Sequence, residues 1–511
     1  MPPRKKKQEP SAPLWEEKEA DKKQSAAQSR AKLQSLVKSA RDIMRKDAGL
    51  NGDLDRLPQL SWLLFLKAFD ERVEQTGAAL DPDYRPAIEE PYRWQDWAPK
   101  RDFSGDDLRA FVNGDLIPHL AGLEGSGADD PRNILSAVFA DVTNRMMSGT
   151  LLRDLVDVVD QIHFTSSDDI HTMAFVYESI LKEMRDAAGD SGEFYTPRPV
   201  NRFMVQQSFL ELGESILDPA CGTGGFLVQA YEDLKDKVET DEQRKQLAGD
   251  LRGIEKKSQP YLLASMNLLL HGINAPQLIH DNALKRMRQS TAAERVNVVL
   301  TNPPFGGEEE QSIVKQFPSG FQTQETAWLF VHAILDQLKK GGRCAVVLPN
   351  GSLFAGGVGA RIKEKLMKEC NLHTIVRLPQ GVFAPYTQIP SNLLFFEKIG
   401  PTKETWFYEI PLPEGRRGYT KTKPMRIEEF EQCVQWWGGK ERKGREAGQQ
   451  AWLVPVEDVK KAGYDLDITN PHVGDAIEHQ TPAELVDELI KVEGEILGLL
   501  EELRAGLGEG K

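Results

Sequence analysis

The fold of this chain is decided by a short stretch, residues 215–226, which reads S-I-L-D-P-A-C-G-T-G-G-F. Its apolar run ends in Asp218 and predicts a buried strand, and the glycines that follow let the backbone turn tightly and approach a ligand. Residues 225–236 then look helical, so free N–H groups at the start of that helix would face the turn. The turn is not a phosphate-binding P-loop, because no Gly-Lys pair in the chain is followed by Ser or Thr.

The same order of strand and helix continues on both sides of this turn, from about residue 195 to residue 410. Further strands are expected at residues 251–255, 296–300, 342–348, 372–378 and 392–397, and further helices at 258–271 and 326–340. Strands that alternate with such helices indicate crossover connections and a mostly parallel sheet covered on both faces. The predicted fold class is therefore α/β, with a doubly wound, Rossmann-like sheet.

The rest of the chain divides around this sheet domain, which is predicted to span residues 191–410. Residues 1–25 are charged and predict a disordered tail, whereas residues 26–190 have apolar positions at helical spacing and predict an all-helical domain, with amphipathic runs that include 131–147 and 168–186. Residues 411–480 are predicted to be an irregular, partly basic extension. Residues 481–511 open on Thr-Pro, a helix-start pattern, and predict an amphipathic helix that docks on a partner or on this chain's own core.

The composition places the chain in a broad class. Its 511 residues include 64 Lys or Arg and 78 Asp or Glu, a formal charge of −14, with 40% hydrophobic residues. At roughly 150 residues per domain, about three globular units are expected, and no apolar run reaches the ~18–20 residues of a membrane span. The four cysteines form no C-x-x-C pair, which argues against a disulfide framework or a zinc site and favours a reducing cytoplasm. The acidic balance argues, weakly, against nucleic-acid binding.

Three acids are predicted to meet at one edge of the sheet. Asp218, Glu255 and Asp281 each end or follow a strand-like run, and ligands of doubly wound sheets bind outside the carboxyl ends of the strands. Asp218 suits an amino group, Glu255 could accept both hydroxyls of a ribose, and Asp281 could accept an exocyclic amine. Each acid alone is more simply a cap or a solvated side chain, so the hypothesis depends on all three together.

A third signal, residues 301–305, reads T-N-P-P-F and follows the strand predicted at 296–300. Two consecutive prolines fix φ at both positions and remove two donors, which leaves the Pro303 carbonyl beside the Asn302 side-chain oxygen. Two acceptors held in this way can each take one hydrogen of a planar –NH₂ group, and Phe305 offers a face on which a base could stack. The alternative is that the segment simply ends a strand.

Together these motifs resemble the amino-group DNA methyltransferases that use S-adenosylmethionine. Residues 218–226 match their cofactor motif, and N-P-P-F at 302–305 matches their catalytic motif. A narrower resemblance is to the modification (M) subunit of type I restriction–modification systems. It is carried by G-E-F-Y-T-P-R at 192–198, L-L-F-L-K at 63–67, V-R-L-P-Q-G-V-F at 376–383 and S-N-L-L-F-F-E-K at 391–398, and it covers roughly residues 25–480.

This resemblance implies a reaction and assigns residues to it. The expected activity is transfer of a methyl group from S-adenosylmethionine to N6 of an adenine that is flipped out of double-stranded DNA, with no metal. Catalysis falls to Asn302, Pro303, Pro304 and Phe305, with Phe383 as the opposite face of the base pocket. The residues expected to contact the cofactor are Glu193, Phe194, Tyr195, Thr196, Pro197 and Arg198 over its methionine end, Asp218, Gly222, Thr223 and Gly224 at the turn, Glu255 at the ribose and Asp281 at the adenine ring.

The resemblance also implies partners in a bacterial or archaeal cytoplasm. The chain contains no Walker motif, and the stretch after the sheet is too short for paired recognition domains. Sequence recognition is therefore expected from a specificity (S) subunit, cleavage and translocation from a restriction (R) subunit, and assembly with a second copy of this M subunit. Within the basic stretch 416–445, the candidates for DNA phosphate contacts are Lys440, Arg442, Lys443 and Arg445, with a solvated loop as an equal alternative.

Two other functions compete with this one. The acceptor pair suits any planar –NH₂, so the substrate could be RNA or a protein glutamine amide, although the large helical domain argues against that. A catalytically silent scaffold that clamps DNA is the rival from another class, and the intact Asn302, Pro303 and Glu255 argue against it. Because the whole chain is acidic, it is expected to bind DNA weakly when alone.

Overall fold

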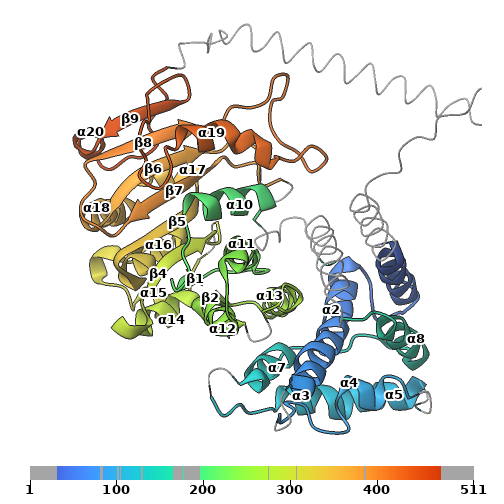
Figure 1. Ribbon diagram of the computed structural model, residues 1–511. Coiled ribbons are helices and arrows are strands. Elements are labelled where there is room, and N and C mark those ends of the chain that lie inside the picture. Colours follow the sequence, from blue (N-terminus) through green and yellow to red (C-terminus); the bar gives the residue numbers. More distant parts are fainter. Residues whose placement is uncertain are drawn as a thin grey trace, which may run out of the picture.

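The computed structural model describes residues 31–80, 84–100, 103, 105–127, 130–164, 177, 196–273, 276–305, 308–384 and 387–472. Two parts are seen in Figure 1, a group of helices formed by the N-terminal residues and a large sheet flanked by helices. Both match the fold class predicted from the sequence. The tail at 1–25, the helix expected at 481–511 and, apart from Tyr177, the run at 168–186 lie outside the described residues.

The described N-terminal residues, 31–164 with the gaps given above, are helical and contain no strand. Residues 31–44 are α-helical. The α-helices that follow are α2 (Asp53–Phe69), α3 (Gln75–Leu80), α4 (Trp94–Trp97), α5 (Gly105–Phe111), α6 (Ile117–Ala121), α7 (Pro131–Phe139) and α8 (Gly149–Asp160). The helix expected to run from 131 to 147 is wrong in its second half, because α7 ends at Phe139 and residues 142–148 are irregular.

One hydrophobic core joins this helical domain to the sheet domain. Besides the N-terminal helices it includes six side chains of α13 (Ser258–Leu270), among them Tyr261, Met266 and Leu270. Other α13 side chains, such as Leu268, pack into a core of the sheet domain. A helix that is apolar on all sides must be covered on all sides, and α13 is accordingly shared by the two domains (Figure 1).

The sheet has nine strands in the order β3-β2-β1-β4-β5-β7-β6-β8-β9. Strands β3, β2, β1, β4 and β5 are parallel to one another, and β7 runs antiparallel between β5 and β6. The strands are β1 (Ile216–Asp218), β2 (Leu251–Glu255), β3 (Gln277–His280), β4 (Val296–Thr301), β5 (Leu338–Pro349), β6 (Asn371–Arg377), β7 (Ser391–Glu397), β8 (Glu404–Glu409) and β9 (Ala451–Pro455). The strand order reverses at β1 and β4, where such sheets bind ligands.

The sheet separates two hydrophobic cores, because successive side chains of a strand point to opposite faces. Leu217 and Val299 lie in one core with α14 (Ala283–Gln289), α16 (Thr326–Gln337) and α18 (Val358–Glu369). Ile216 and Val298 lie in the other core, which α10 (Arg198–Gln207) and α11 (Gly225–Leu234) cover. Both faces are therefore covered, as the continuous apolar strands predict.

Two expectations from the sequence are wrong, one about where a helix ends and one about the segment after residue 410. The helix predicted to reach residue 340 ends at Gln337, because Leu338 pairs with Val296 and begins β5. The segment 411–480, expected to be irregular, adds β9 to the sheet, where Trp452 stacks on Phe407 with ring centroids 5.3 Å apart. It also contains α19 (Glu431–Trp436) and α20 (Val456–Lys461). The pairing of β9 with β8 joins Val454 to Thr405 and Ala451 to Tyr408, residues far apart in sequence, and local periodicity does not show such a contact.

Candidate active site

The glycine turn lies between the end of β1 and the start of α11. Gly222 and Gly224 have φ of +53° and +76°, a left-handed conformation that costs glycine little. The N–H of Gly224 donates to the carbonyl of Cys221 at 2.7 Å, which closes the turn. At Gly225, a Cβ would lie 2.6 Å from the Asn201 side chain of α10. The turn therefore requires glycine at three positions, as the sequence motif indicates.

Glu255 ends β2 and reaches across to this turn. One carboxylate oxygen accepts the N–H of Gly222 at 2.9 Å, and the other accepts the N–H of Lys257 at 2.8 Å. The side chain is 8% exposed, and burial raises its pKa above the usual range. Since a carboxylate has about four acceptor sites, each oxygen keeps one for a further donor. Glu255 is thus fixed in position and still able to accept two hydroxyl groups.

Asp218 has a different environment from the one predicted. It is 1% exposed, accepts the N–H of Ala220 at 3.1 Å, and does not line the cavity described below. Burial, together with the nearby charge of Glu255, raises the pKa of Asp218 to about 7. Asp218 is therefore a buried side chain that contacts the backbone at the start of the turn.

Asp281 follows β3, as expected. Its carboxylate accepts the N–H of Asn282 at 2.7 Å and lies 3.5 Å from the Lys285 ammonium group. The neighbouring Asn282 lines the cavity, whereas Asp281 does not. The prediction of an acid at this strand end is thus correct, but the adjacent Asn282 was not predicted from the sequence.

Asn302 follows β4 and is held by a contact that sequence spacing did not reveal. Its side-chain N–H donates to the hydroxyl of Thr196 at 3.0 Å. This fixes which way the amide points, and leaves the Asn302 side-chain oxygen buried with no hydrogen-bond partner in the structure. Among the described residues, no backbone hydrogen bond is accepted by the Pro303 carbonyl either. A buried acceptor without a donor is costly in a folded protein, so its donor is expected to come from a ligand.

A cavity of about 120 Å³ connects these features at the carboxyl ends of β1, β2, β3 and β4. It is lined by Pro219, Ala220, Gly222, Ile254, Glu255, Lys256, Lys257, Asn282, Ala283, Asn302, Pro304, Glu309 and Phe330. The glycine turn, the ribose-type acid and the acceptor after β4 therefore share one cavity.

The structure describes part of the segment expected to cover the cofactor. Thr196 contacts Asn302, Pro197 precedes α10, and Arg198 is the first residue of that helix. Glu193, Phe194 and Tyr195 lie outside the described residues. The segment thus reaches the acceptor after β4, a connection between two motifs far apart in sequence.

Three polar residues near the cavity were not singled out from the sequence. Asn267 of α13 donates to the Thr223 carbonyl at 2.8 Å, which ties the glycine turn to the helix shared by both domains. Glu309 accepts from Asn282 at 3.1 Å and lies 3.3 Å from the Lys256 ammonium group. Nothing in their local sequence marks these residues, because their role depends on the strand order.

Phe305 and Phe383 come together in a different arrangement from the one predicted. Their ring centroids are 5.9 Å apart, and the planes are inclined at 72°, an edge-to-face contact. Phe383 is buried. The two rings therefore contact each other directly, and the sandwich expected to enclose a base is not formed in this structure.

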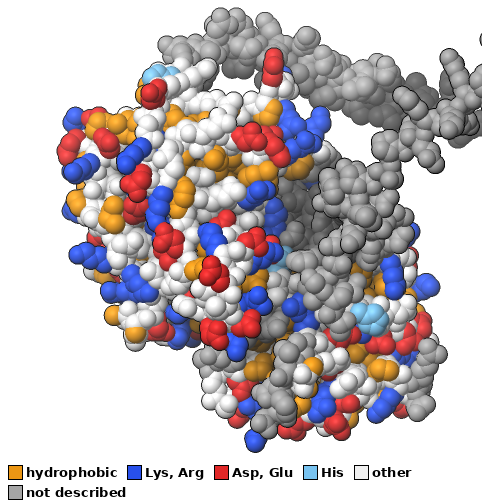
Figure 2. Space-filling view, viewed as in Figure 1, with side chains coloured by type: hydrophobic (Ala, Val, Ile, Leu, Met, Phe, Trp, Pro, Cys, Tyr) orange, Lys and Arg blue, Asp and Glu red, His pale blue; other side chains and the backbone are white. Residues whose placement is uncertain are grey.

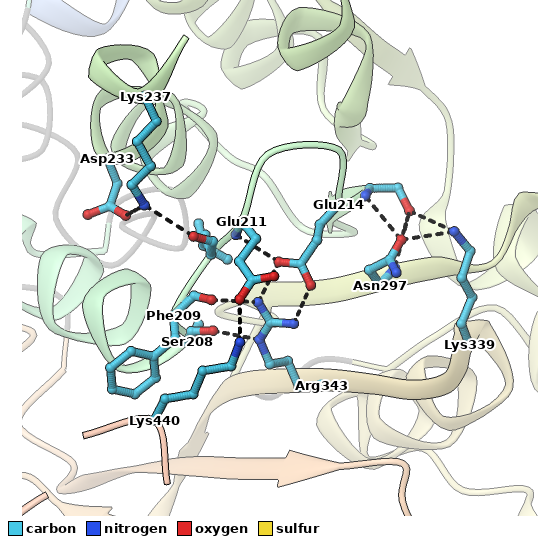
Figure 3. A network of polar contacts seen from close by, with 12 residues as sticks. Ser208, Phe209, Glu211, Glu214, Asp233, Lys237, Asn297, Lys339, Arg343 and Lys440 are labelled. Atoms are coloured by element: carbon cyan, nitrogen blue, oxygen red, sulfur yellow. Dashed lines mark hydrogen bonds and ion pairs between the residues drawn. The ribbon is translucent and has the colours of Figure 1, made fainter. Parts of the chain in front are cut away.

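The residues expected to contact DNA phosphates lie on the side of the sheet where β4 and β5 begin, opposite the cavity. Lys440 pairs with Glu211 in the polar network of Figure 3, beside Arg343 of β5. Arg442 donates two hydrogen bonds to Glu397, at the end of the antiparallel strand β7. This edge carries the amino ends of β4 and β5, whereas the cavity is at their carboxyl ends.

Arg445 is also unsuited to that role. Its guanidinium group lies 4.6 Å and 4.7 Å from the rings of Trp436 and Trp437, and it donates to the Trp437 carbonyl and the Thr374 hydroxyl at 2.8 Å each. Burial lowers its pKa to about 9. Of the four cations, only Lys443 is exposed without a described partner. The expectation of a phosphate-binding cluster is wrong for Arg445 and is opposed by the position of Lys440 and Arg442.

The visible surface of the sheet domain has mixed charge. Figure 2 shows Lys and Arg side chains interspersed with Asp and Glu, and apolar side chains scattered between them. Among the described residues, no three His, Cys, Asp or Glu side chains are grouped so that they could hold a metal ion. In the same part of the chain, no helix is long and apolar enough to cross a bilayer.

A doubly wound sheet with a glycine turn after β1, an acid at the end of β2 and paired acceptors after β4 defines the class of S-adenosylmethionine-type methyltransferases. The model of the N-6 DNA Methylase family matches residues 168–480, and that of the HsdM N-terminal domain matches residues 33–159. The chain therefore belongs to the N-6 DNA methylase family, and within it to the modification subunits of type I restriction enzymes.

Individual relatives agree with this assignment. The chain is 48% identical to the type I restriction enzyme EcoEI methylase subunit of Escherichia coli over 93% of this chain and 98% of the relative. It also resembles the crystal structure of a modification subunit of a putative type I restriction enzyme from Vibrio vulnificus YJ016, with 49% identity, a TM-score of 0.78 and coverage of 88% of this chain and 99% of that one. A chain from a structure on complex assembly and conformational transition of the type I R-M system gives 41% identity, a TM-score of 0.78 and coverage of 94% and 99%.

Proposed function

We propose that this chain transfers a methyl group from S-adenosylmethionine to N6 of an adenine in double-stranded DNA. The observation that carries the proposal is the buried Asn302 side-chain oxygen, which has no donor in the structure and borders the same cavity as Glu255 and the glycine turn. A planar –NH₂ group supplies the missing donor. Family membership narrows that group to the exocyclic amine of adenine.

The acceptor pair acts on the nucleophile. The lone pair of the adenine amine is delocalised into the ring, so the amine attacks poorly while it is planar. Hydrogen bonds to the Asn302 oxygen and the Pro303 carbonyl draw its hydrogens out of the plane and stabilise the positive charge that develops on nitrogen. Because these bonds strengthen as the charge develops, they favour the transition state over the ground state.

The rest of the cavity offers groups that suit the methyl donor and its ribose hydroxyls. S-adenosylmethionine supplies an electrophilic sulfonium methyl when it is bound. Glu255 would accept its ribose hydroxyls through the two free acceptor sites, and Gly222 lets the backbone approach without a Cβ. Thr196, at the end of the 193–198 segment, would lie toward the methionine part, with Asn282 and Asp281 toward the adenine ring.

The base must leave the duplex to reach Asn302, which costs a few kcal/mol. Stacking on Phe305 would return on the order of 1–3 kcal/mol. Because the rings of Phe305 and Phe383 are now in edge contact, we infer that one of them rotates when the base enters. DNA recognition is assigned to a separate specificity subunit, with a second copy of this chain and a restriction subunit completing the complex. The related chain from a type I R-M assembly supports this arrangement.

The test measures methyl incorporation from tritiated S-adenosylmethionine into DNA, RNA and protein, with and without a candidate specificity subunit. We expect incorporation into DNA adenine only, dependent on that subunit and lost in Asn302→Ala. The exposed Gln316→Ala serves as the control for an amide removed away from the site. Incorporation into RNA or glutamine would support the rival substrates, and cofactor binding without transfer to any acceptor would support the silent scaffold.

A further inference from the structure

We propose that Phe354 and Ile389 form an apolar pair that enters the DNA base stack beside the flipped adenine. This inference rests on the proposed function and extends it to the part of the DNA that the base leaves behind. In the described part of the chain, Phe354 and Ile389 are among the few large apolar side chains that are exposed, at 58% and 53%. Single exposed apolar side chains are ordinary, so the argument depends on where these two lie.

Both residues lie near the carboxyl ends of the parallel strands, where the acceptor pair also lies. β4 and β5 are parallel neighbours, with Thr301 opposite Val346, so Asn302 and the helix α17 (Asn350–Phe354) leave the sheet at the same edge. β7 is antiparallel to β5, with Ser391 opposite Pro349, so residues 387–390 arrive at that edge. The N–H of Asn350 donates to the Pro390 carbonyl at 2.8 Å, which holds the two approaches together.

Ile389 is also connected to the aromatic pair. The loop that precedes β7 carries Phe383, whose ring contacts Phe305, and the N–H of Thr387 donates back to the Phe383 carbonyl at 3.5 Å. Ile389 in turn donates its N–H to the Thr387 hydroxyl at 3.0 Å. A short chain of contacts therefore runs from the base-stacking residue Phe305 to the exposed side chain of Ile389.

Phe354 is exposed on a rigid support. The preceding residue, Leu353, is fully buried, and its carbonyl accepts hydrogen bonds from Lys363 and from the N–H of Leu466. The Trp328 indole donates to the carbonyl of Ser352 at 3.2 Å. The helix end is thus anchored on its inner side while the Phe354 ring faces outward. Rigid presentation keeps the entropy cost of a contact low.

Two exposed cations belong to the segment that packs against the loop of Phe383. Tyr419 is buried and donates its N–H to the Gln380 carbonyl at 3.0 Å, so the loop around it packs against the loop that carries Phe383. Arg417 and Lys423, near Tyr419 in sequence, are exposed. Proteins that distort DNA commonly combine cations for the phosphates with apolar side chains inserted between bases. A duplex from which a base has been flipped therefore fits this surface.

The experiment compares two DNA duplexes in the assembled methyltransferase, one with the target adenine paired to thymine and one with it mispaired. For Phe354→Ala, Ile389→Ala and the double variant, we expect kcat/KM on the paired duplex to fall roughly ten- to a hundredfold, the range of a lost base-stacking contact. On the mispaired duplex the loss should be at least tenfold smaller, because that adenine needs less help to leave the stack. Ile399→Ala is the matched control, since Ile399 is 59% exposed and follows β7 at the other edge.

Each outcome decides the matter. Rescue by the mispaired duplex with unchanged S-adenosylmethionine affinity supports the inference. Equal losses on both duplexes, or no loss on either, overturn it, as does loss of the specificity subunit from the complex on gel filtration, which would make the pair a protein interface. If the unsubstituted enzyme methylates neither duplex, the proposed function itself is wrong, and this inference falls with it.

Discussion

Replacing Glu255 with Gln should weaken S-adenosylmethionine binding roughly ten- to 150-fold. In the structure, each carboxylate oxygen of Glu255 accepts one backbone N–H, from Gly222 at 2.9 Å and from Lys257 at 2.8 Å. Each oxygen then has one site left for a ribose hydroxyl. Glutamine offers one oxygen and one –NH₂ in the same shape, so one of the two hydroxyls loses its acceptor. A hydrogen bond to a charged group contributes about 1.5–3 kcal/mol, and ~1.4 kcal/mol is a tenfold change in affinity.

The same substitution should also lower the stability of the protein without cofactor. The –NH₂ of Gln must face either Gly222 or Lys257, and the unsatisfied backbone N–H costs about 1–3 kcal/mol. Calorimetric titration gives Kd, and thermal unfolding of the free protein gives the stability change. Glu310→Gln is the control, because Glu310 is a neighbouring acid with a 66% exposed side chain. A Kd within twofold of the original value, with the expected loss of stability, would refute the assignment of Glu255 to the ribose and leave it a structural residue.

Three further substitutions, two of them with a control, test buried side chains and a close backbone contact in the sheet domain. Burial raises the pKa of Asp218 to about 7 from 3.8, so the folded state holds a proton that the unfolded chain loses, and stability falls as pH rises from about 4 to 7. Asp218→Asn removes this dependence, so its melting temperature should improve relative to the original protein between pH 5 and pH 8; a constant difference would contradict the buried proton. Gly253→Ala places a methyl group 2.6 Å from a leucine side chain of β3 and should cost about 1–3 kcal/mol in urea unfolding. Gly249→Ala, whose Cβ meets nothing within 4 Å, should be neutral or stabilising. Arg445→Ala should cost about 2–4 kcal/mol through its lost ring contacts and hydrogen bonds, whereas Lys443→Ala should change stability by less than about 0.5 kcal/mol. A loss for Arg445→Ala as small as that of the control would show that Arg445 is not structural.

The sequence predicted best those parts of the site that act through the local backbone. The glycine turn and N-P-P-F work through φ angles and missing donors, which are properties of adjacent residues. The alternation of apolar strands with helices likewise gave the sheet and its covered faces. For the same reason the carboxyl edge of the sheet could be identified as the place for the acids, since strand direction follows from crossover connections.

Contacts between distant segments could not be predicted in this way. The hydrogen bond from Asn302 to Thr196 depends on how the start of α10 folds over the sheet. The burial of Asp218 depends on side chains from other strands, such as Thr301 of β4. The basic residues 440–445 look like a solvated cluster in sequence, but the chain passes from α19 to β9 along the amino edge of β5, where Glu211 and Glu397 neutralise two of them. Charge counted along a chain does not show which edge of a sheet it occupies.

The two edges of the sheet explain why a chain with a net charge of −14 can act on DNA. At the amino ends of the central strands, three cations form ion pairs within the protein. The pairs are Lys440 with Glu211, Arg442 with Glu397 and Arg343 with Glu214. At the carboxyl ends of the same strands, Asp218 and Glu255 are buried, while the exposed Glu310 is paired with Lys256. An anionic duplex is therefore accepted over a small area only. With few phosphate contacts, we expect this chain alone to bind DNA weakly and with a shallow salt dependence. We expect most of the affinity to come from a partner that contacts the DNA more widely.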